Sequence, residues 1–375
     1  MILSFFYIAV FVISLYSLML LILLLSVRKS RLINTTDWNT KISILIAARN
    51  EERNIETCLK SILNQIYPSH LLEIIVVDDH SEDKTFELAK NTLHESKIAY
   101  QVLSLKNIGT QGKKAALEYG MSKASGELII CTDADSYASS INWISTYVNI
   151  YCNKGAQLIA APVIYNNDKS FLAAFQQIEL LILNVISAGT FNIKKPIMCN
   201  GANMAFTKKV FEEVRGYEGN RNVASGDDVF LLNKITSLHP NSVAYLFSVE
   251  ALVYTQAATS IKAFIQQRLR WAGKFKYNKN KFNFFLGLLT FTTNVSWVFL
   301  IPSMLVSASL TKCLIVLLLT KCLIDFLLLF LGAIFFKRKR ILMWFPLVAV
   351  IYPFYVSLSA LFGAFIQIDW KGRKI

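Results

Sequence analysis

Long apolar segments stand at both ends of this 375-residue chain and enclose a charged middle. The first, residues 2–27, is almost uninterrupted and is long enough to cross a bilayer as a helix, at about 1.5 Å per residue. Three more lie near the carboxyl terminus, at about residues 284–306, 314–336 and 341–367. A single soluble core cannot bury this much apolar surface, so we expect an N-terminal membrane anchor, a globular domain and a C-terminal membrane region.

Two of these segments leave alternatives open. A cleaved signal peptide is the weaker interpretation of the first, because no Lys or Arg precedes the run and it exceeds the apolar core of a signal. Pro346 and Pro353 fall within the last segment, so both a kinked span and a re-entrant pair fit it.

Basic residues beside the apolar segments predict their orientation. Arg28, Lys29 and Arg31 follow the first segment, and Lys-Arg-Lys-Arg at residues 337–340 separates the last two. By the positive-inside rule, residues 32–281 are cytoplasmic in a multi-pass protein of the cell membrane. The formal charge of +14 suits anionic lipid and an anionic substrate. No basic stripe interleaved with aromatics is present, so no nucleic-acid partner is expected. The six scattered cysteines argue against a disulfide or zinc framework.

Short β-branched runs alternate with helical patterns from Lys41 onward. Strands are predicted at residues 42–47, 73–77, 98–103 and 128–132, with helices at about 51–66 and from 82. This alternation predicts a parallel α/β sheet with right-handed crossovers, in which ligands gather at the carboxyl ends of the strands. The next segments predict a strand at 156–163, an apolar helix at 171–188, a turn into a strand at 199–206 and a basic amphipathic helix at 261–271.

Two of the predicted strands end in paired carboxylates. Asp133 and Asp135 close the apolar run that starts at Leu128, and Asp78 and Asp79 follow the predicted strand at residues 73–77. Like charges held this close cost free energy unless a cation lies between them. Carboxylate oxygens suit Mg²⁺ or Mn²⁺, which keep room for substrate phosphates. We therefore expect a divalent metal at Asp133 and Asp135, against the alternative of a solvated loop.

Further polar motifs follow in order along the domain. The set is Ala47-Ala-Arg-Asn-Glu-Glu52, Asp78-Asp-His-Ser81, Gly112-Lys113, Asp133-Ala-Asp135, Asn200-Gly-Ala-Asn203, Asp227-Asp228 and Gln267-Arg-Leu-Arg-Trp271. Each motif alone is weakly specific, but the ordered set over residues 41–275 resembles the membrane-bound family 2 glycosyltransferases. The resemblance implies a GT-A (Rossmann-like) α/β domain that binds a nucleotide-diphosphate sugar, with one N-terminal and about three C-terminal transmembrane segments.

The resemblance also implies roles for individual residues. Asp78 would accept a hydrogen bond from the nucleotide base, Glu51 and Asp79 would belong to the same nucleotide-sugar site, and Lys113 would lie near the diphosphate. Asp133 would contact the ribose and the metal, and Asp135 would ligate the metal. Asn203, Gln267, Arg270 and Trp271 would serve the diphosphate and the acceptor, with Arg270 on phosphate oxygens and Trp271 against a sugar ring.

Simpler interpretations remain for some of these side chains. Asp78 could cap a strand end, Lys113 and Lys114 could form a solvated pair, and Arg268 could snorkel at the membrane surface.

The acidic pair Asp227-Asp228 is implied to hold the general base. Asp228 is the predicted base, because Asp228-Val-Phe-Leu231 aligns with the family's Asp-x-x-Leu, while Asp227 stands where a Glu is common. Ser225 is a candidate N-cap for the helix that these carboxylates begin.

These observations predict four regions: an anchor at 1–31, a cytoplasmic catalytic domain at 41–275, a membrane region at 282–367 and a basic tail at 368–375. The predicted activity is an inverting glycosyltransferase of the hexosyltransferase type, moving a UDP-linked sugar to a hydroxyl of a lipid or polysaccharide. The alternatives are a processive polysaccharide synthase and a catalytically inactive scaffold. A dinucleotide-dependent oxidoreductase is disfavoured, because no Gly-x-Gly-x-x-Gly follows the first strand.

Overall fold

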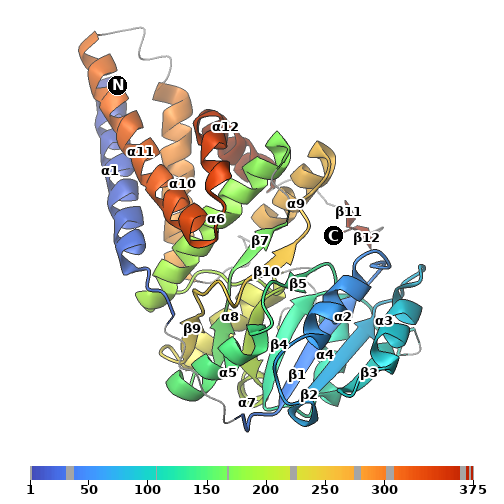
Figure 1. Cartoon of the computed structure of the whole chain (residues 1–375). Coiled ribbons are helices and arrows are strands. Elements are labelled where there is room, and N and C mark those ends of the chain that lie inside the picture. Colours follow the sequence, from blue (N-terminus) through green and yellow to red (C-terminus); the bar gives the residue numbers. More distant parts are fainter. Residues whose placement is uncertain are drawn as a thin grey trace. The chain divides into compact units, whose positions relative to one another are not determined.

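The chain forms two compact units. The computed structural model describes residues 2–30, 38–106, 108–166, 169–219, 226–273, 280–300, 308–363, 369–370 and 373–374. The sheet unit comprises Arg28–Asn166 and Met198–Gln256, and the helical unit comprises Met1–Val27, Asn167–Ile197 and Ala257–Ile375 (Figure 1). This division differs from the predicted domain at 41–275, because helices α6 (Phe171–Asn192) and α9 (Ile261–Gly273) belong to the helical unit.

The sheet unit is built on a seven-stranded sheet in the order β3-β2-β1-β4-β8-β6-β9. The strands are β1 (Ile42–Ala48), β2 (Leu72–Asp78), β3 (Ala99–Ser104), β4 (Leu128–Asp133), β6 (Leu158–Ala160), β8 (Met204–Thr207) and β9 (Val243–Tyr245). Strands β1 to β4 are parallel, as predicted. Strand β8 is antiparallel to both β4 and β6, so the sheet is mixed rather than wholly parallel. The reason is that the chain enters β8 at the carboxyl edge, where Met204 pairs with Cys131 and Ala160.

The strand predicted at residues 156–163 is in fact two strands in different sheets. Strand β6 ends at Ala160 and β7 (Val163–Tyr165) joins a small sheet with β10 (Val253–Thr255) and β5 (Tyr137–Ala138). Pro162 lies between them, and a proline has no N–H to continue a ladder.

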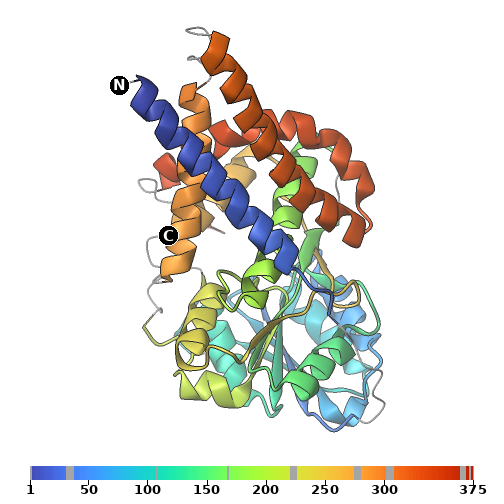
Figure 2. The same cartoon turned by 90° about the vertical axis from the view of Figure 1, so that its left-hand side faces the viewer.

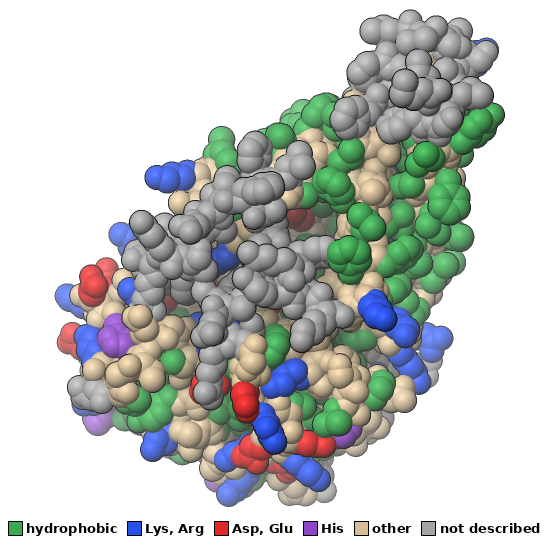
Figure 3. Space-filling view, turned by 180° about the vertical axis from the view of Figure 1, so that it is seen from behind, with side chains coloured by type: hydrophobic (Ala, Val, Ile, Leu, Met, Phe, Trp, Pro, Cys, Tyr) green, Lys and Arg blue, Asp and Glu red, His purple; other side chains and the backbone are tan. Residues whose placement is uncertain are grey.

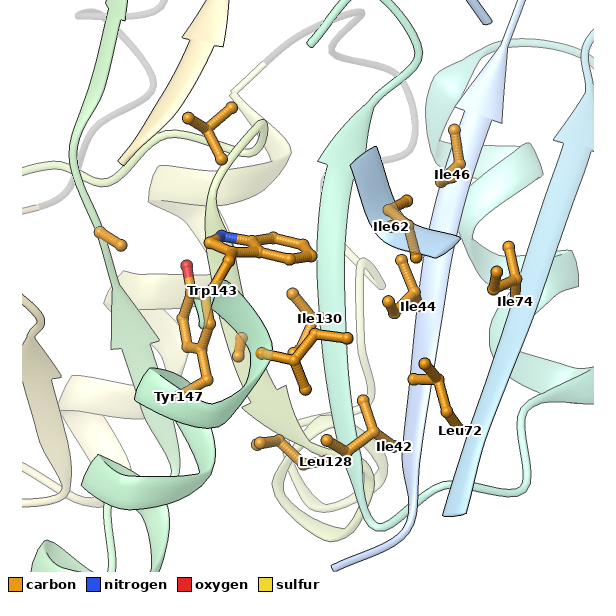
Figure 4. Close-up of a cluster of buried hydrophobic side chains, with 14 of the residues drawn as sticks. Ile42, Ile44, Ile46, Ile62, Leu72, Ile74, Leu128, Ile130, Trp143 and Tyr147 are labelled. Atoms are coloured by element: carbon orange, nitrogen blue, oxygen red, sulfur yellow. The ribbon is translucent and has the colours of Figure 1, made fainter. Parts of the chain in front are cut away.

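Alternate residues of the central strands pack against opposite layers of helices. Helices α2 (Ile55–Leu63), α3 (Thr85–His94) and α5 (Trp143–Lys154) cover the face that carries Ile44, Ile74 and Ile130, and these side chains form one buried cluster (Figure 4). Helix α4 (Lys113–Lys123) covers the other face, where Gly120 lies so close to Leu45 that a Cβ would overlap its side chain. The unit is completed by η1 (Ser69–Leu71), α7 (Lys208–Glu213) and α8 (Asp227–Leu238).

The helical unit contains the predicted apolar segments. Its other elements are α1 (Ile2–Ser26), α10 (Lys281–Leu300), α11 (Ala308–Phe335), η4 (Lys339–Trp344), α12 (Phe345–Gly363), and a short ribbon of β11 (Asp369–Trp370) and β12 (Arg373–Lys374). Helix α1 packs against α6, α10 and α11 (Figure 2). Helix α12 continues through Pro353. The predicted layout of one N-terminal and three C-terminal apolar helices is confirmed.

Large apolar side chains face outward on the helical unit. Exposed residues include Phe11 and Leu25 of α1 and Val316 and Leu319 of α11, and Figure 3 shows such side chains gathered over these helices. By length and composition, four helices among the described residues could cross a membrane: Phe6–Ser26, Phe171–Asn192, Thr311–Phe335 and Lys339–Ala360.

Helix α6 is mostly buried by its neighbours, unlike the other three helices of this set. Gly189 of α6 lies against the backbone of Leu23, and a Cβ there would overlap the Leu23 carbonyl. Gly332 of α11 likewise approaches the carbonyl of Leu181. Small residues at these crossings let the backbones come close, so α6 forms the centre of the unit and not a lipid-facing surface.

Candidate active site

The carboxyl ends of β1, β2 and β4 bring the acidic motifs together. Ala48 of β1 pairs with Asp78, and Ala47 pairs with Asp133, so both acidic clusters lie at one edge of the sheet, as predicted. Here the strand order turns, because β2 and β3 lie on one side of β1 and β4 lies on the other. Ligands of α/β sheets bind at such a point.

Asp78 is buried with one carboxylate oxygen unsatisfied. Asp78 is 2% exposed; its Oδ2 accepts from the backbone N–H of Ser81 at 3.3 Å, and its Oδ1 has no hydrogen-bond partner among the described residues. Buried acceptors without a donor are rare, because they lose hydration without compensation. The predicted capping contact is therefore present, and it uses only one of the two carboxylate oxygens.

Asp79 instead accepts a hydrogen bond from the residue before Lys113. Its Oδ1 accepts the backbone N–H of Gly112 at 3.0 Å and lies 3.2 Å from Nδ1 of His80. Gly112 has a φ of 100°, a conformation that favours glycine, and it directly precedes α4. Asp79 thus fixes the start of α4.

Lys113 forms an ion pair with Asp133 at the end of β4. Burial lowers the pKa of Lys113, but Asp133, Asp227 and Asp228 more than offset this and hold its pKa well above the usual value. Lys113 is therefore a permanent cation among carboxylates. Lys113 and Lys114 do not form the solvated pair given as an alternative, because Lys114 is buried and its Nζ lies 3.8 Å from Oδ1 of Asp227.

Asp135 stands in an electrostatically unfavourable place for an anion. Burial, with the negative charges of Asp133 and Glu51, raises the pKa of Asp135 to about 6. Glu51 is held in turn by Asn54, whose Nδ2 donates to Glu51 Oε2 at 2.8 Å. The negative charges of Asp133 and Glu51 therefore act on Asp135.

This donor set fits a divalent cation. Among the described residues, no cluster of three or more His, Cys, Asp and Glu side chains can enclose a metal ion by itself. Asp133 and Asp135 would hold Mg²⁺ or Mn²⁺ from one side, leaving the other ligand positions to water and to substrate phosphate, as Mg²⁺ sites commonly do.

Asp227 and Asp228 begin α8 and lie in different environments. Asp227 is 8% exposed and lies near Lys114. Asp228 is partly exposed, and its Oδ2 accepts the backbone N–H of Gly201 at 3.0 Å. A Cβ at Gly201 would stand 3.6 Å from Lys113 Nζ and 3.7 Å from Asp228 Oδ2, so that cation and this carboxylate are neighbours. Ser225, the predicted N-cap, lies outside the described residues, and Gly226 occupies the N-cap position.

Asn203 lies in the core instead of at a ligand surface. Its amide is 0% exposed and has four partners: Oδ1 accepts from Trp143 Nε1 at 2.9 Å and Tyr147 OH at 2.7 Å, and Nδ2 donates to the carbonyls of Pro162 and Ala251. This corrects the expected position of Asn203 beside the acceptor or diphosphate, because its hydrogen-bonding capacity is fully used. It fixes the turn that enters β8.

The remaining predicted residues, Gln267, Arg270 and Trp271, lie on α9 of the helical unit and are partly exposed. Arg268 between them is 4% exposed and pairs with Glu179. It therefore does not snorkel, which corrects the alternative given for it above. The sequence alone indicates only a solvated lysine at Lys114 and assigns no role to Gly201 or Glu179. Lys114 and Gly201 stand next to or within recognised motifs, whereas Glu179 carries no local signal.

The mixed sheet, with its acidic residues at the strand-order turn, is a GT-A-like α/β fold. Residues 43–215 match the family model described as Glycosyl transferase family 2, and the chain carries a domain of this family. The resemblance drawn from the motifs is thereby confirmed.

Relatives agree with this assignment. "Probable glycosyltransferase YdaM" of Bacillus subtilis (strain 168) is 27% identical over 64% of this chain and 57% of its own length. The poly-beta-1,6-N-acetyl-D-glucosamine synthase of Staphylococcus epidermidis is 27% identical over 62% of this chain and 53% of its own length. The chain thus spans little more than half of these curated relatives.

A solved structure matches almost the whole chain. The mannosyltransferase PcManGT of Pyrobaculum calidifontis, in complex with GDP-Man and Mn²⁺, aligns with a TM-score of 0.60 over 96% of this chain and 97% of that chain. The sequences are 17% identical, so this likeness establishes the fold.

Proposed function

We propose that the chain transfers a sugar from a nucleotide-diphosphate donor, UDP-linked, to a hydroxyl of a lipid or polysaccharide acceptor, with inversion at the anomeric carbon. The observation that carries this proposal is the position of a partly exposed carboxylate, Asp228, near the cation Lys113 at the carboxyl edge of the sheet. Relatives of this domain include enzymes named as glycosyltransferases and as a polysaccharide synthase, which supports the reaction class.

The residues suggest how the transfer proceeds. Asp228 accepts the proton of the acceptor hydroxyl while that oxygen bonds to the anomeric carbon, and the bond from this carbon to the diphosphate oxygen breaks. Lys113 offsets the negative charge that develops on the departing diphosphate. A divalent cation held by Asp133 and Asp135 would supply further positive charge there when bound. Asp227, buried beside Lys114, serves to support the site.

We expect Asp78 to accept a hydrogen bond from the nucleotide base, because its buried Oδ1 has no hydrogen-bond partner in the described part of the chain. A base N–H is a donor of suitable polarity for this oxygen. We expect Asp78→Asn to weaken UDP binding by roughly 10- to 100-fold, since a hydrogen bond to a charged group contributes about 1.5–3 kcal/mol and the amide can present a donor instead. Calorimetric titration of UDP, with Glu82→Gln on the adjacent exposed turn as control, measures this. Equal affinity in both variants contradicts the assignment.

We expect the acceptor to lie at the membrane surface, because the helical unit exposes many large apolar side chains. Arg28, Lys29 and the basic run at residues 337–340 support a cytoplasmic sheet unit. A lipid hydroxyl and a growing polysaccharide both fit this location.

Membrane vesicles test the activity, the donor and the orientation together. We expect inverted vesicles from cells that express the chain to incorporate label from added UDP-sugars, while sealed right-side-out vesicles do not, because these donors do not cross the bilayer. Mass spectrometry of the product distinguishes a single sugar on lipid from a polymer. Incorporation only in right-side-out vesicles contradicts the orientation, and incorporation equal to that of an Asp228→Asn control in both preparations contradicts the activity.

A further inference from the structure

Helix α9 presents three side chains of its motif and buries the other two, Arg268 and Leu269. Helical spacing puts Phe264, Arg268 and Trp271 along one stripe of α9. Gln267, Arg270 and Trp271 are each partly exposed, whereas Arg268 is buried. A buried guanidinium needs a partner, because an unpaired charge away from water is costly.

That partner is Glu179 of α6. Its Oε2 accepts from Arg268 Nε at 2.7 Å and lies 2.5 Å from Nη2, so it engages two nitrogens of the planar fork. Its other oxygen, Oε1, accepts from Tyr355 OH of α12 at 3.2 Å. Glu179 therefore joins α6, α9 and α12, which Figure 1 shows in the helical unit.

Through this pair, Arg268 is fixed against both ends of the motif. Its guanidinium carbon lies 4.2 Å from the centroid of the Trp271 ring and 4.7 Å from that of Phe264. Nη1 donates to Oε1 of Gln267 at 2.6 Å. One face of Trp271 is thus covered by a cation, and the amide of Gln267 is oriented through its Oε1.

Helix α6 also holds the segment that enters α9. The amide of Gln176 is 0% exposed; its Oε1 accepts from the N–H of Ala258 at 3.0 Å and its Nε2 donates to the Ala258 carbonyl at 3.0 Å. The rings of Phe175 and Phe264 lie 5.7 Å apart. Helix α6 therefore contacts both the segment that precedes α9 and the first turn of α9.

We propose that Glu179 is a positioning residue for Gln267 and Trp271, the partly exposed side chains at the two ends of the α9 motif. By holding Arg268, it determines which face of Trp271 and which atoms of Gln267 can meet an acceptor sugar. The inference rests on the proposed function and on the acceptor role that the family resemblance implies for Gln267 and Trp271. Positioning groups of this kind affect rate strongly, since a displacement of about 1 Å can cost roughly 100-fold.

The experiment separates acceptor from donor kinetics in the full chain, purified and reconstituted in vesicles of host polar lipids with labelled UDP-sugar. We expect Glu179→Gln to lower kcat/KM for the acceptor lipid by roughly 10- to 100-fold, while the KM for the donor stays within about twofold. Asp325→Asn is the matched control: it breaks another buried pair of the helical unit, Lys321–Asp325 at 2.8 Å. It should reduce thermal stability but leave the ratio of acceptor to donor KM unchanged.

A double variant distinguishes positioning from mere stability. Glu179→Gln combined with Arg268→Gln leaves no buried charge unpaired, so it should recover the thermal stability lost in Glu179→Gln. It should not recover acceptor kinetics, because the stacked guanidinium is gone. Recovery of both, or an unchanged acceptor KM in Glu179→Gln, overturns the inference.

Fluorescence reports on Trp271 without any activity. Loss of the stacked cation in Glu179→Gln should change the emission of Trp271, and the change should vanish in a Trp271→Phe background. A spectrum unaltered by Glu179→Gln contradicts the inference. If the wild-type chain transfers no sugar but the spectral change is present, the proposed function fails and the positioning contact stands.

Discussion

Replacing Asp228 by Asn is expected to slow sugar transfer by about 10²–10⁴-fold, the usual contribution of a positioned general base. The amide keeps the size of the carboxylate and can still accept the N–H of Gly201, which lies 3.0 Å from Oδ2. The fold and the donor site should therefore persist. Transfer rates at saturating donor, together with the affinity for UDP, measure the effect: the rate falls and the affinity stays.

Asp227→Asn is the matched variant, one residue away. Asp227 is buried, and its Oδ1 lies 3.8 Å from Lys114 Nζ, so the change should lower the thermal stability of the protein. We expect transfer to remain within about tenfold of wild type. If Asp227→Asn is inactive and Asp228→Asn is active, the roles of the two carboxylates are exchanged.

Asp135→Ala is expected to abolish transfer and the stabilisation of the protein by UDP with Mn²⁺. In the wild type, a ligand at about 100 times its Kd stabilises the fold by roughly 2.7 kcal/mol, which a thermal scan detects. The variant should lose this increment but should not unfold. Burial and the charges of Asp133 and Glu51 raise the pKa of Asp135 to about 6. In the unfolded chain the pKa of this carboxyl is lower, so its ionisation makes the folded state less stable as the pH rises from the unfolded-state pKa to about 6.

The control for Asp135 is Glu56→Gln, an exposed carboxylate on α2 that pairs with Lys60 at 3.0 Å. It should retain both activity and the response to Mn²⁺. Excess chelator should inactivate the wild type, and added Mg²⁺ or Mn²⁺ should restore it. Full turnover of the purified protein in chelator contradicts a metal at Asp133 and Asp135.

Several features of the protein could be predicted because they depend on neighbours in the sequence. The β-branched run at 128–132 predicts a buried strand, and β4 is found at Leu128–Asp133. The parallel direction of β1, β2 and β4 then places Asp78 and Asp133 at one edge without further information. Segments long and apolar enough to span a bilayer, such as residues 2–27, are likewise visible in any window of that length.

Other features depend on partners far away along the chain. Asn203 stands in a polar motif, yet its amide is enclosed by Trp143, 60 residues away, and by Ala251, 48 residues away. Arg268 looks like a membrane-surface cation until Glu179, 89 residues away, is placed beside it. No local pattern contains these pairs.

The sequence by itself therefore determined the identity of the strands, the edge that carries the acidic residues and the apolar helices, because hydrophobic period and strand direction are local or nearly local properties. Only the tertiary structure decided the antiparallel entry of β8, the membership of α6 in the helical unit, and which member of each polar pair is buried. Asp227 and Asp228 are adjacent and chemically identical, yet Asp227 is buried near Lys114, while Asp228 is partly exposed and accepts the N–H of Gly201. Burial and pairing are set by residues distant in sequence, so the division of labour within the acidic pair appears only once the chain is folded.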